Sequence, residues 1–288
     1  MAHLSARLPQ NVPGEFFVDS TCIDCETCMI VAPEVFAESG DASYVHAQPA
    51  TPEAVHRAQM ALISCPTSSI GTVAKVSGGK EAARAFPEGI GDDVFYCGYA
   101  SEDSYGASSY LIRRSGGNVL VDSPRAAAPL LSRIEELGGV RWMFLTHRDD
   151  IADHAKFRER FGCERIIHAG DDVICAERVI TGTDAVALDG ELTVIPTPGH
   201  TRGSAVLQWR GHVLFTGDHL WGDETGAKLA ASRGVAWHSW REQTESMERL
   251  LALPFDRVLP GHGRPYRAAS VEAAHADLEG LVSRMRSR

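Results

Sequence analysis

Apolar residues in the second part of the chain come in short runs separated by turn residues. These runs predict strands at 109–112, 118–122, 141–146, 192–196, 205–209, 213–216 and 257–259. The first two are joined by Arg-Arg-Ser-Gly-Gly, which predicts a hairpin. A helix is expected over 126–137, ended by Gly138 and Gly139. Several of the strands lead directly into a histidine or an aspartate.

The first part of the chain has a different pattern. Residues 15–18 predict a strand, and Thr51 followed by Pro52 predicts a capped helix start, with the helix running to Cys65. Residues 79–92 are rich in glycine, alanine and charge, as a linker would be. We therefore expect two domains, over 1–78 and 93–288, joined by a linker over 79–92.

Composition agrees with two domains and limits the partners. A chain of 288 residues that is 44% hydrophobic can bury two sizeable cores. The net charge of -10 argues against a nucleic-acid partner and is compatible with docking to a basic redox protein. The amino terminus lacks an apolar leader, and no apolar stretch has the length of a membrane span. A reducing cytoplasm is the expected location.

Four cysteines carry the first chemical signal. Cys22, Cys25 and Cys28 form a C-x-x-C-x-x-C triplet, and Cys65 stands before Pro66. Three closely spaced thiolates can hold one face of an iron-sulfur cubane, and a remote C-P supplies the fourth ligand. A zinc site and a disulfide framework are the rival interpretations. Zinc sites usually pair two C-x-x-C elements or end in histidine, and disulfides are not expected without a secretory signal.

The segment around these cysteines resembles the bacterial single-cluster ferredoxins over roughly residues 14–76. The resemblance includes Glu15-Phe16-Phe17-Val18-Asp19 before the triplet and Ala32-Pro33-Glu34-Val35-Phe36 after it. It implies one [4Fe-4S] cluster held by Cys22, Cys25, Cys28 and Cys65. It also implies a redox role, since the spacing alone shows no electron flow.

Histidines and aspartates at strand ends form the second signal. Thr146-His147-Arg148-Asp149-Asp150-Ile151-Ala152-Asp153-His154 is followed by Thr197-Pro198-Gly199-His200, then Thr216-Gly217-Asp218, then Pro260-Gly261-His262. Histidine nitrogens and aspartate oxygens from several loops can hold two divalent ions close together, with one carboxylate bridging them. We expect His147 and His200 at one ion, Asp153, His154 and His262 at the other, and Asp218 between them.

This order of motifs resembles the metallo-β-lactamase superfamily, and its glyoxalase-II-like branch in particular, over roughly residues 93–267. The resemblance implies an α+β chain in which a small ferredoxin-like domain precedes an αββα sandwich. It also implies a site for two divalent metals, zinc or iron or possibly manganese.

The chain departs from the family in its first ligand motif. The usual H-x-H-x-D-H would place ligands at 147, 149, 151 and 152, but residues 151 and 152 are Ile and Ala, and the D-H pair comes two residues later. Either Asp149 or Asp150 replaces the second histidine. A carboxylate there favours iron or manganese over zinc, and the flavodiiron branch of the superfamily likewise has a carboxylate at this position. Asp149 and Asp153 are the candidate catalytic groups.

Three functions remain open from the sequence. The first is metal-dependent hydrolysis of an ester, a thioester or a similar small molecule, with an aspartate shuttling the proton. The second is a di-iron oxidoreductase or oxygenase that receives electrons from the ferredoxin domain. The third is an electron-transfer module whose second domain is inactive. The segment from Trp221 to Trp240 is expected to cover the metal site, its aromatic residues lining an apolar pocket or packing a helix.

Overall fold

The computed structural model describes residues 1–287 and divides into two compact units. The first contains Met1–Arg141 and Ala152–Phe161, and the second contains Trp142–Ile151 and Gly162–Arg288. The strands from 88 to 121 belong to the same unit as the cysteine-rich segment. The domain ranges 1–78 and 93–288 remain a prediction, because the two units are divided elsewhere.

The cysteine-rich segment is built from two small antiparallel pairs and two helices. β1 (Phe16–Val18) pairs with β4 (Ile70–Thr72), and β2 (Phe36–Glu38) pairs with β3 (Ser43–Val45). The helices are α1 (Thr27–Val31) and α2 (Pro52–Ser64). α2 begins as predicted, because Thr51 accepts a hydrogen bond from the Ala54 amide (3.1 Å) and Pro52 occupies the first turn.

Residues 79–92, expected as a linker, are ordered into a helix and a strand. α3 spans Gly79–Arg84 and β5 spans Glu88–Gly91. β5 pairs with β6 (Val94–Tyr96), so that its backbone groups are used in a sheet instead of being solvated as in a linker. The glycine- and alanine-rich composition that suggested a linker instead belongs to a short helix and an edge strand.

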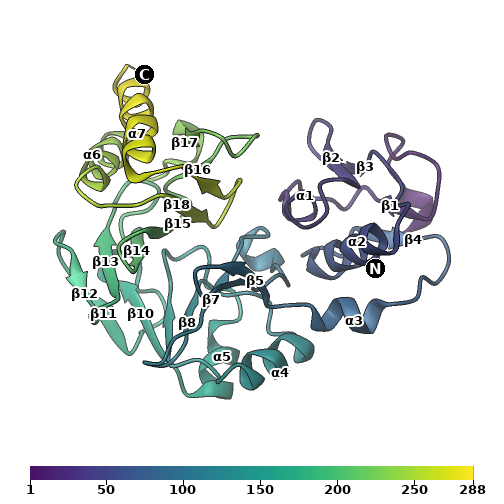
Figure 1. The fold of residues 1–288 in the computed structure, drawn as a ribbon, viewed down its shortest axis with the longest axis horizontal. Coiled ribbons are helices and arrows are strands. Elements are labelled where there is room, and N and C mark those ends of the chain that lie inside the picture. The colour runs from purple at the N-terminus through teal and green to yellow at the C-terminus, as the bar shows by residue number, and fades with distance from the viewer. Residues whose placement is uncertain (288) are drawn as a thin grey trace. The chain divides into compact units, whose positions relative to one another are not determined.

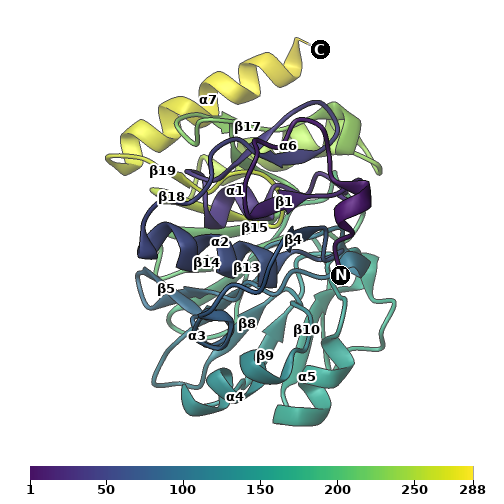
Figure 2. The same cartoon turned by 90° about the vertical axis from the view of Figure 1, so that its right-hand side faces the viewer.

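The remaining strands of the first unit continue this antiparallel sheet. β6 pairs with β7 (Tyr110–Ile112), and β7 pairs with β8 (Val119–Val121), which confirms the expected hairpin. β7 and β8 are buried at every position. α4 (Ala128–Glu136) matches the expected helix, and it lies beside α5 (His154–Phe161), as Figure 2 shows and the ion pair between Arg160 and Glu135 (2.5 Å) confirms.

The second unit contains a parallel set of strands and a mixed sheet. β9 (Trp142–Phe144), β10 (Glu164–His168) and β11 (Arg178–Ile180) pair in parallel. The mixed sheet has the order β12 (Val186–Ala187), β13 (Leu192–Pro196), β14 (Ala205–Trp209), β15 (Val213–Gly217), β18 (Arg257–Pro260) and β19 (Tyr266–Arg267). β16 (Trp221–Gly222) and β17 (Leu229–Ala230) form a separate pair. All the strands predicted for this unit are present.

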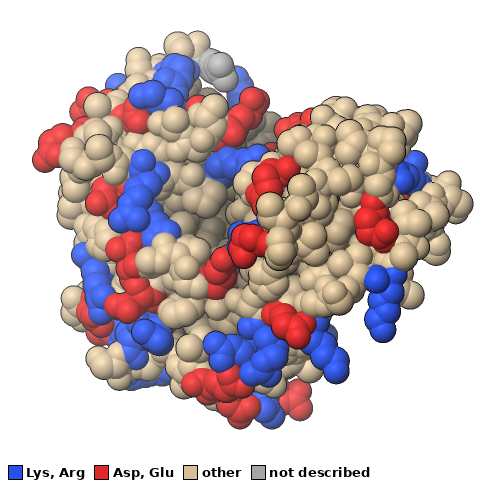
Figure 3. Space-filling view, turned by 45° about the vertical axis from the view of Figure 1, so that its right-hand side comes forward, with Lys and Arg blue, Asp and Glu red and all other residues tan. Residues whose placement is uncertain are grey.

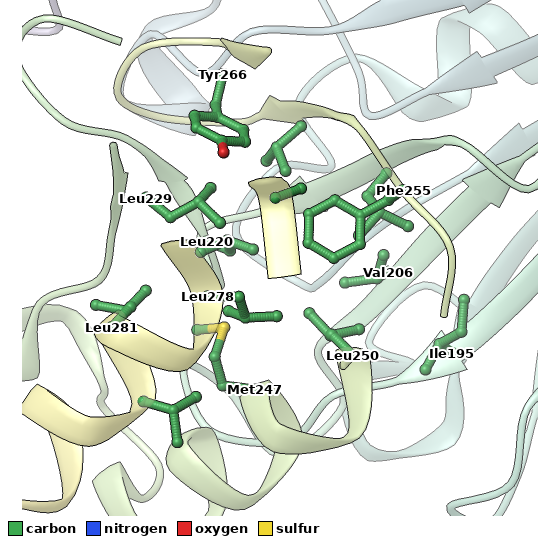
Figure 4. Close-up of a cluster of buried hydrophobic side chains, with 14 of the residues drawn as sticks. Ile195, Val206, Leu220, Leu229, Met247, Leu250, Phe255, Tyr266, Leu278 and Leu281 are labelled. Atoms are coloured by element: carbon green, nitrogen blue, oxygen red, sulfur yellow. The ribbon is translucent and has the colours of Figure 1, made fainter. Parts of the chain in front are cut away.

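Two helices cover one face of the mixed sheet, α6 (Trp240–Leu250) and α7 (Val271–Arg286) (Figure 1). Their apolar faces meet the sheet in one buried cluster, part of which Figure 4 shows; its labelled residues are Ile195, Val206, Leu220, Leu229, Met247, Leu250, Phe255, Tyr266, Leu278 and Leu281. This core fixes β13, β15 and β18, whose following loops carry the candidate ligands.

The last features of the fold are the charge of its surface and the hydropathy of its helices. Basic and acidic side chains are interspersed on the face shown in Figure 3. Among residues 1–287, no helix combines the length and the hydropathy needed to cross a membrane.

Candidate metal centres

The four cysteines of the first unit line one cavity. Cys22 and Cys25 lie in the loop after β1, Cys28 lies in α1, and Cys65 directly follows α2. The rest of the lining consists of apolar and hydroxyl side chains: Val18, Ile23, Thr27, Ser43, Thr67, Ser69 and Ile70. Four thiols around one largely apolar cavity fit a [4Fe-4S] cluster.

The surroundings of the thiols also fit bound iron. The Ser69 amide donates to Cys65 Sγ (3.2 Å) and the Asp24 amide to Cys22 Sγ (3.5 Å), the kind of contact that tunes a cluster. Burial raises the pKa of Cys25 to about 11 and also raises that of Cys28. Without a cation these thiols are therefore neutral, and cluster binding must release their protons.

A residue beyond the expected ferredoxin-like range packs directly against Cys25. Gly106 lies so close that a Cβ there would be 2.4 Å from the Cβ of Cys25, and its φ of +84° suits glycine. The hydroxyl of Thr27 donates to the Gly106 carbonyl (3.1 Å). The loop before β7 therefore packs against one of the four cysteines.

The second centre lies where several strands of the second unit end. His147 follows β9, His200 follows β13, Asp218 follows β15, and His262 follows β18. β15 and β18 are parallel neighbours, so their carboxyl ends meet at the same edge of the sheet. β14 is antiparallel to both β13 and β15, so β13 runs in the same direction as β15. The loop after β13, which bears His200, therefore lies at that same edge.

Asp218 is central in this group. Its Oδ2 atom lies 3.7 Å from Nε2 of His147, 3.6 Å from Nε2 of His200 and 3.9 Å from Nε2 of His262. Asp149 approaches the same two buried histidines, with Oδ2 at 3.8 Å from His147 and 3.6 Å from His200. Five of the predicted ligands are thus brought together.

Asp149 and Asp150 both belong to groups of possible ligand atoms, whereas the sequence left open which of them replaces the second histidine. His147, Asp149 and His200 form one group of ligand atoms close enough for an ion, and His147, Asp150 and Asp218 form another. Asp150 is buried, with 1% of its surface exposed. The two successive carboxylates therefore face different parts of the same centre.

Two glycines make room for this arrangement. A Cβ on Gly261 would lie 2.7 Å from Oδ2 of Asp150 and 2.8 Å from Oδ1 of Asp218. A Cβ on Gly217, whose φ is +50°, would lie 2.4 Å from Oγ1 of Thr146. Gly261 is thus required by the close approach of two carboxylates of the centre, and Gly217 by the close approach of Thr146.

The polar atoms of the centre fit bound cations. Among the described residues, Nε2 of His147, Oδ2 of Asp149, Nε2 of His200 and Oδ1 of Asp218 are buried atoms without a hydrogen-bond partner. Burial lowers the pKa of His147, which keeps its imidazole neutral. Burial also acts to lower the pKa of His200, but Asp149 and Asp218 hold it above its usual value. Such a negative field would stabilise divalent ions.

Asp153 and His154 are placed differently from the expectation. Asp153 Oδ2 accepts the Ala126 amide (2.8 Å), and Oδ1 pairs with Nζ of Lys156 (2.7 Å). His154 is the first residue of α5. Neither belongs to the two groups of ligand atoms found among residues 1–287. The longer loop carries the D-H pair into the helix start, and Asp150 takes a place near Asp218 instead.

Asp171 is a supporting residue that the sequence did not reveal. Its buried carboxylate accepts the Arg148 amide (3.2 Å), the Gly203 amide (3.0 Å) and the Thr201 hydroxyl. It thereby joins the loop bearing His147 to the loop bearing His200. In the sequence, the one feature that points to Asp171 is its position shortly after the run 164–168. This run forms β10, a strand that the sequence analysis does not include.

Comparison with known proteins agrees with both parts of the chain. The sequence model of the "4Fe-4S single cluster domain of Ferredoxin I" matches residues 18–72, and that of the "Metallo-beta-lactamase superfamily" matches residues 104–262. The chain belongs to the metallo-β-lactamase superfamily. It carries a ferredoxin-like iron-sulfur domain before the superfamily domain, as predicted.

Among relatives within the superfamily are hydroxyacylglutathione hydrolases. One from Rhodospirillum rubrum is 33% identical over 163 residues, covering 53% of this chain and 60% of that protein. One from Anaeromyxobacter dehalogenans is 33% identical over 205 residues, covering 61% of this chain and 74% of that protein. The chain thus spans less than two thirds of the first relative's length and about three quarters of the second's.

Solved structures show the metallo-β-lactamase fold. DIM-1 metallo-β-lactamase exposed to ceftazidime superimposes with a TM-score of 0.51 at 18% identity, covering 67% of this chain and 95% of that one. VMB-1 superimposes with a TM-score of 0.52 at 17% identity and the same coverage. The predicted α+β class, with a ferredoxin-like domain before a metallo-β-lactamase sandwich, is confirmed.

Proposed function

We propose that the protein is a metal-dependent hydrolase that cleaves a small ester or thioester at a two-metal site. The observation that carries this proposal is the meeting of two histidines and two carboxylates: Nε2 of His147 and Nε2 of His200 each lie within 4 Å of an oxygen of both Asp149 and Asp218. His262 also approaches Asp218. Hydroxyacylglutathione hydrolase relatives support thioesters as the class to test first.

The sequence predicts Asp153 and His154 as ligands of the second ion. In the ligand set that we propose, Asp150 takes their place. His147, Asp149 and His200 would hold one ion, Asp150 and His262 the other, and Asp218 would bridge them. Three carboxylates beside three histidines favour iron or manganese over zinc. Bound divalent ions supply Lewis-acid polarisation of the carbonyl and a water of lowered pKa.

Neighbouring groups orient the two buried histidines. Thr146 Oγ1 lies 3.0 Å from Nδ1 of His147, and the Val235 carbonyl lies 2.5 Å from Nδ1 of His200. If each Nδ1 carries the proton and donates it in these bonds, each Nε2 is left with its lone pair toward Asp149 and Asp218. The Val235 carbonyl, which can only accept, thus selects the tautomer of His200 that a metal ligand needs, and the Thr146 hydroxyl is compatible with the same tautomer of His147.

Substrate would reach the centre beside Asp149 and His262. The side chain of Asp149 is 37% exposed and that of His262 is 29% exposed, whereas His147 and His200 are 1% exposed. An exposed carboxylate next to the reacting carbonyl can accept a proton from the attacking water and deliver it to the leaving group. We assign that role to Asp149, and not to Asp153, whose carboxylate is paired with Lys156.

A second candidate function is redox chemistry at a di-iron centre fed by the cluster. The three carboxylates of the proposed ligand set are the observation that favours it, together with the iron-sulfur domain in the same chain. In either case the cluster would exchange electrons with a redox partner protein. We place the protein in a reducing compartment such as the cytoplasm, because four of the seven cysteines of the chain would serve as cluster thiolates.

The proposal is tested with anaerobically purified protein and a panel of thioesters. Wild type should contain about four cluster irons and additional divalent metal, and should hydrolyse at least one thioester. Asp218→Ala should lose the additional metal and the hydrolysis while the cluster absorption remains. Asp256→Asn, which removes a carboxylate paired with His212 at the surface (3.2 Å), is the matched control.

A Cys65→Ala variant separates the two candidate functions. Hydrolysis should survive loss of the cluster in a variant that remains folded, whereas a redox turnover should not. Hydrolysis by Asp218→Ala at the wild-type rate would overturn the proposed site. Dioxygen consumption that depends on reduced cluster, without any thioester cleavage, would favour the di-iron function instead.

A further inference from the structure

Trp237 is an exposed aromatic residue directly beside a ligand histidine. It is 65% exposed, and its ring centroid lies 4.9 Å from that of His200, with the planes inclined at 40°. Single exposed apolar side chains are common on protein surfaces and need no explanation. This one differs because one side of the indole contacts the metal centre while the rest remains open.

The backbone around Trp237 is tied to the loop that carries His200. Val235 accepts from His200 Nδ1, the His238 amide donates to the His200 carbonyl (2.9 Å), and the Ser239 amide donates to the Gly199 carbonyl (2.9 Å). These bonds lie on both sides of Trp237 in the sequence. The indole is therefore attached to a fixed segment, which lowers the entropy cost of using it for binding.

A second indole from the same region lies near another ligand. Trp221 begins β16, and its ring packs so closely on Gly263 that a Cβ there would be 2.6 Å from Cδ1 of the indole. Gly263 directly follows His262, the more exposed ligand histidine. Trp240 has a different role, since its Nε1 donates to the Met285 carbonyl (3.2 Å) and joins α6 to α7.

We propose that Trp237, supported by Trp221, is an aromatic platform that binds an apolar group on the acyl side of the substrate. The proposal rests on the function proposed above and defines its substrate class as esters or thioesters with an alkyl or aryl acyl group. An indole offers a large, rigid apolar surface with few rotatable bonds, which suits contact with such a group. Trp237 is then a specificity-determining residue.

The test is a series of acyl thioesters of one thiol, N-acetylcysteamine, with acetyl, butanoyl, hexanoyl and octanoyl groups. Burying a methylene completely is worth about fourfold in binding, and half of that burial on an open platform corresponds to about twofold per methylene. We expect kcat/KM of wild type to rise by about this factor per methylene. Trp237→Ala should flatten the dependence on chain length, and Trp237→Phe should retain most of it.

A matched control is Val179→Ala, which removes an exposed apolar side chain from β11. A second readout uses no turnover. In metal-free protein, octanoate but not acetate should change the tryptophan fluorescence of wild type, and the change should be lost in Trp237→Phe. Metal removal thus separates platform binding from catalysis.

The outcomes distinguish this inference from the proposed function. Wild type that hydrolyses thioesters without preference for longer chains, or Trp237→Ala that loses the same factor on acetyl and octanoyl substrates, would overturn the platform and leave the hydrolase standing. Wild type that hydrolyses no member of the series would overturn both.

Discussion

Asp171 offers a direct test of how the fold holds the second metal centre. Its carboxylate accepts the Arg148 amide, the Gly203 amide and the Thr201 hydroxyl, and only 1% of the residue is exposed. Removal by Asp171→Ala leaves buried donors without this acceptor. At about 1.5 kcal/mol for each of the three bonds, the low end for a charged acceptor, the free energy of unfolding should fall by about 4.5 kcal/mol.

Asp171→Asn keeps the shape and one acceptor oxygen, so about half of this loss is expected. Urea unfolding of both variants measures the stability. Competition with a chelator measures the affinity of the second centre, which should fall by about 10- to 100-fold because the loops bearing His147 and His200 lose their common support. The absorption of the iron-sulfur cluster should be unchanged.

Wild-type metal affinity in Asp171→Asn would contradict a role of Asp171 in positioning the two loops. A loss of stability with no change in metal affinity would show that Asp171 holds the fold without positioning the ligands. A stabilised Asp171→Asn would contradict the account of the buried bonds altogether.

Three further predictions concern other residues. Gly261→Ala should empty the second centre in metal analysis, because the new Cβ would lie 2.7 Å from Oδ2 of Asp150; full metal occupancy would contradict this. Asp153→Asn should retain metal and hydrolysis, and loss of metal without unfolding would restore the ligand role expected from the sequence. Burial acts to raise the pKa of Asp277, but bonds including that from Lys228 Nζ (2.6 Å) lower it. A depressed folded pKa gives stability that is present at neutral pH and lost in acid, so Asp277→Asn should cost about 1 kcal/mol at pH 7, less toward pH 3, and no cost at pH 7 would refute it.

The ligands that could be predicted from the sequence are those that follow apolar strands. His200, Asp218 and His262 come after runs that could be identified one by one, and each stands beside a glycine or proline that marks a turn. The four cysteines were found for a different reason, since their spacing alone matches one cluster. In both cases the chemistry is local in the sequence.

What could not be predicted depends on contacts between distant segments. Asp171 acts through backbone amides of Arg148 and Gly203, which leave no trace in residue spacing. The placement of Asp150 near Asp218 depends on how the longer loop after β9 folds. Gly106 contacts Cys25 only because the loop before β7 folds back onto that cysteine. The composition of segment 79–92 predicts a linker, because a short edge strand carries little pattern of its own.

The most direct test of the central claim is a metal titration of cluster-intact protein. Divalent metal at the second centre is removed with a mild chelator under anaerobic conditions, and iron, manganese or zinc is added back while thioester hydrolysis is followed. We predict that hydrolysis returns and saturates at about two equivalents per chain, with the cluster absorption constant throughout. Hydrolysis that never returns, or that is complete without added metal, would contradict this prediction.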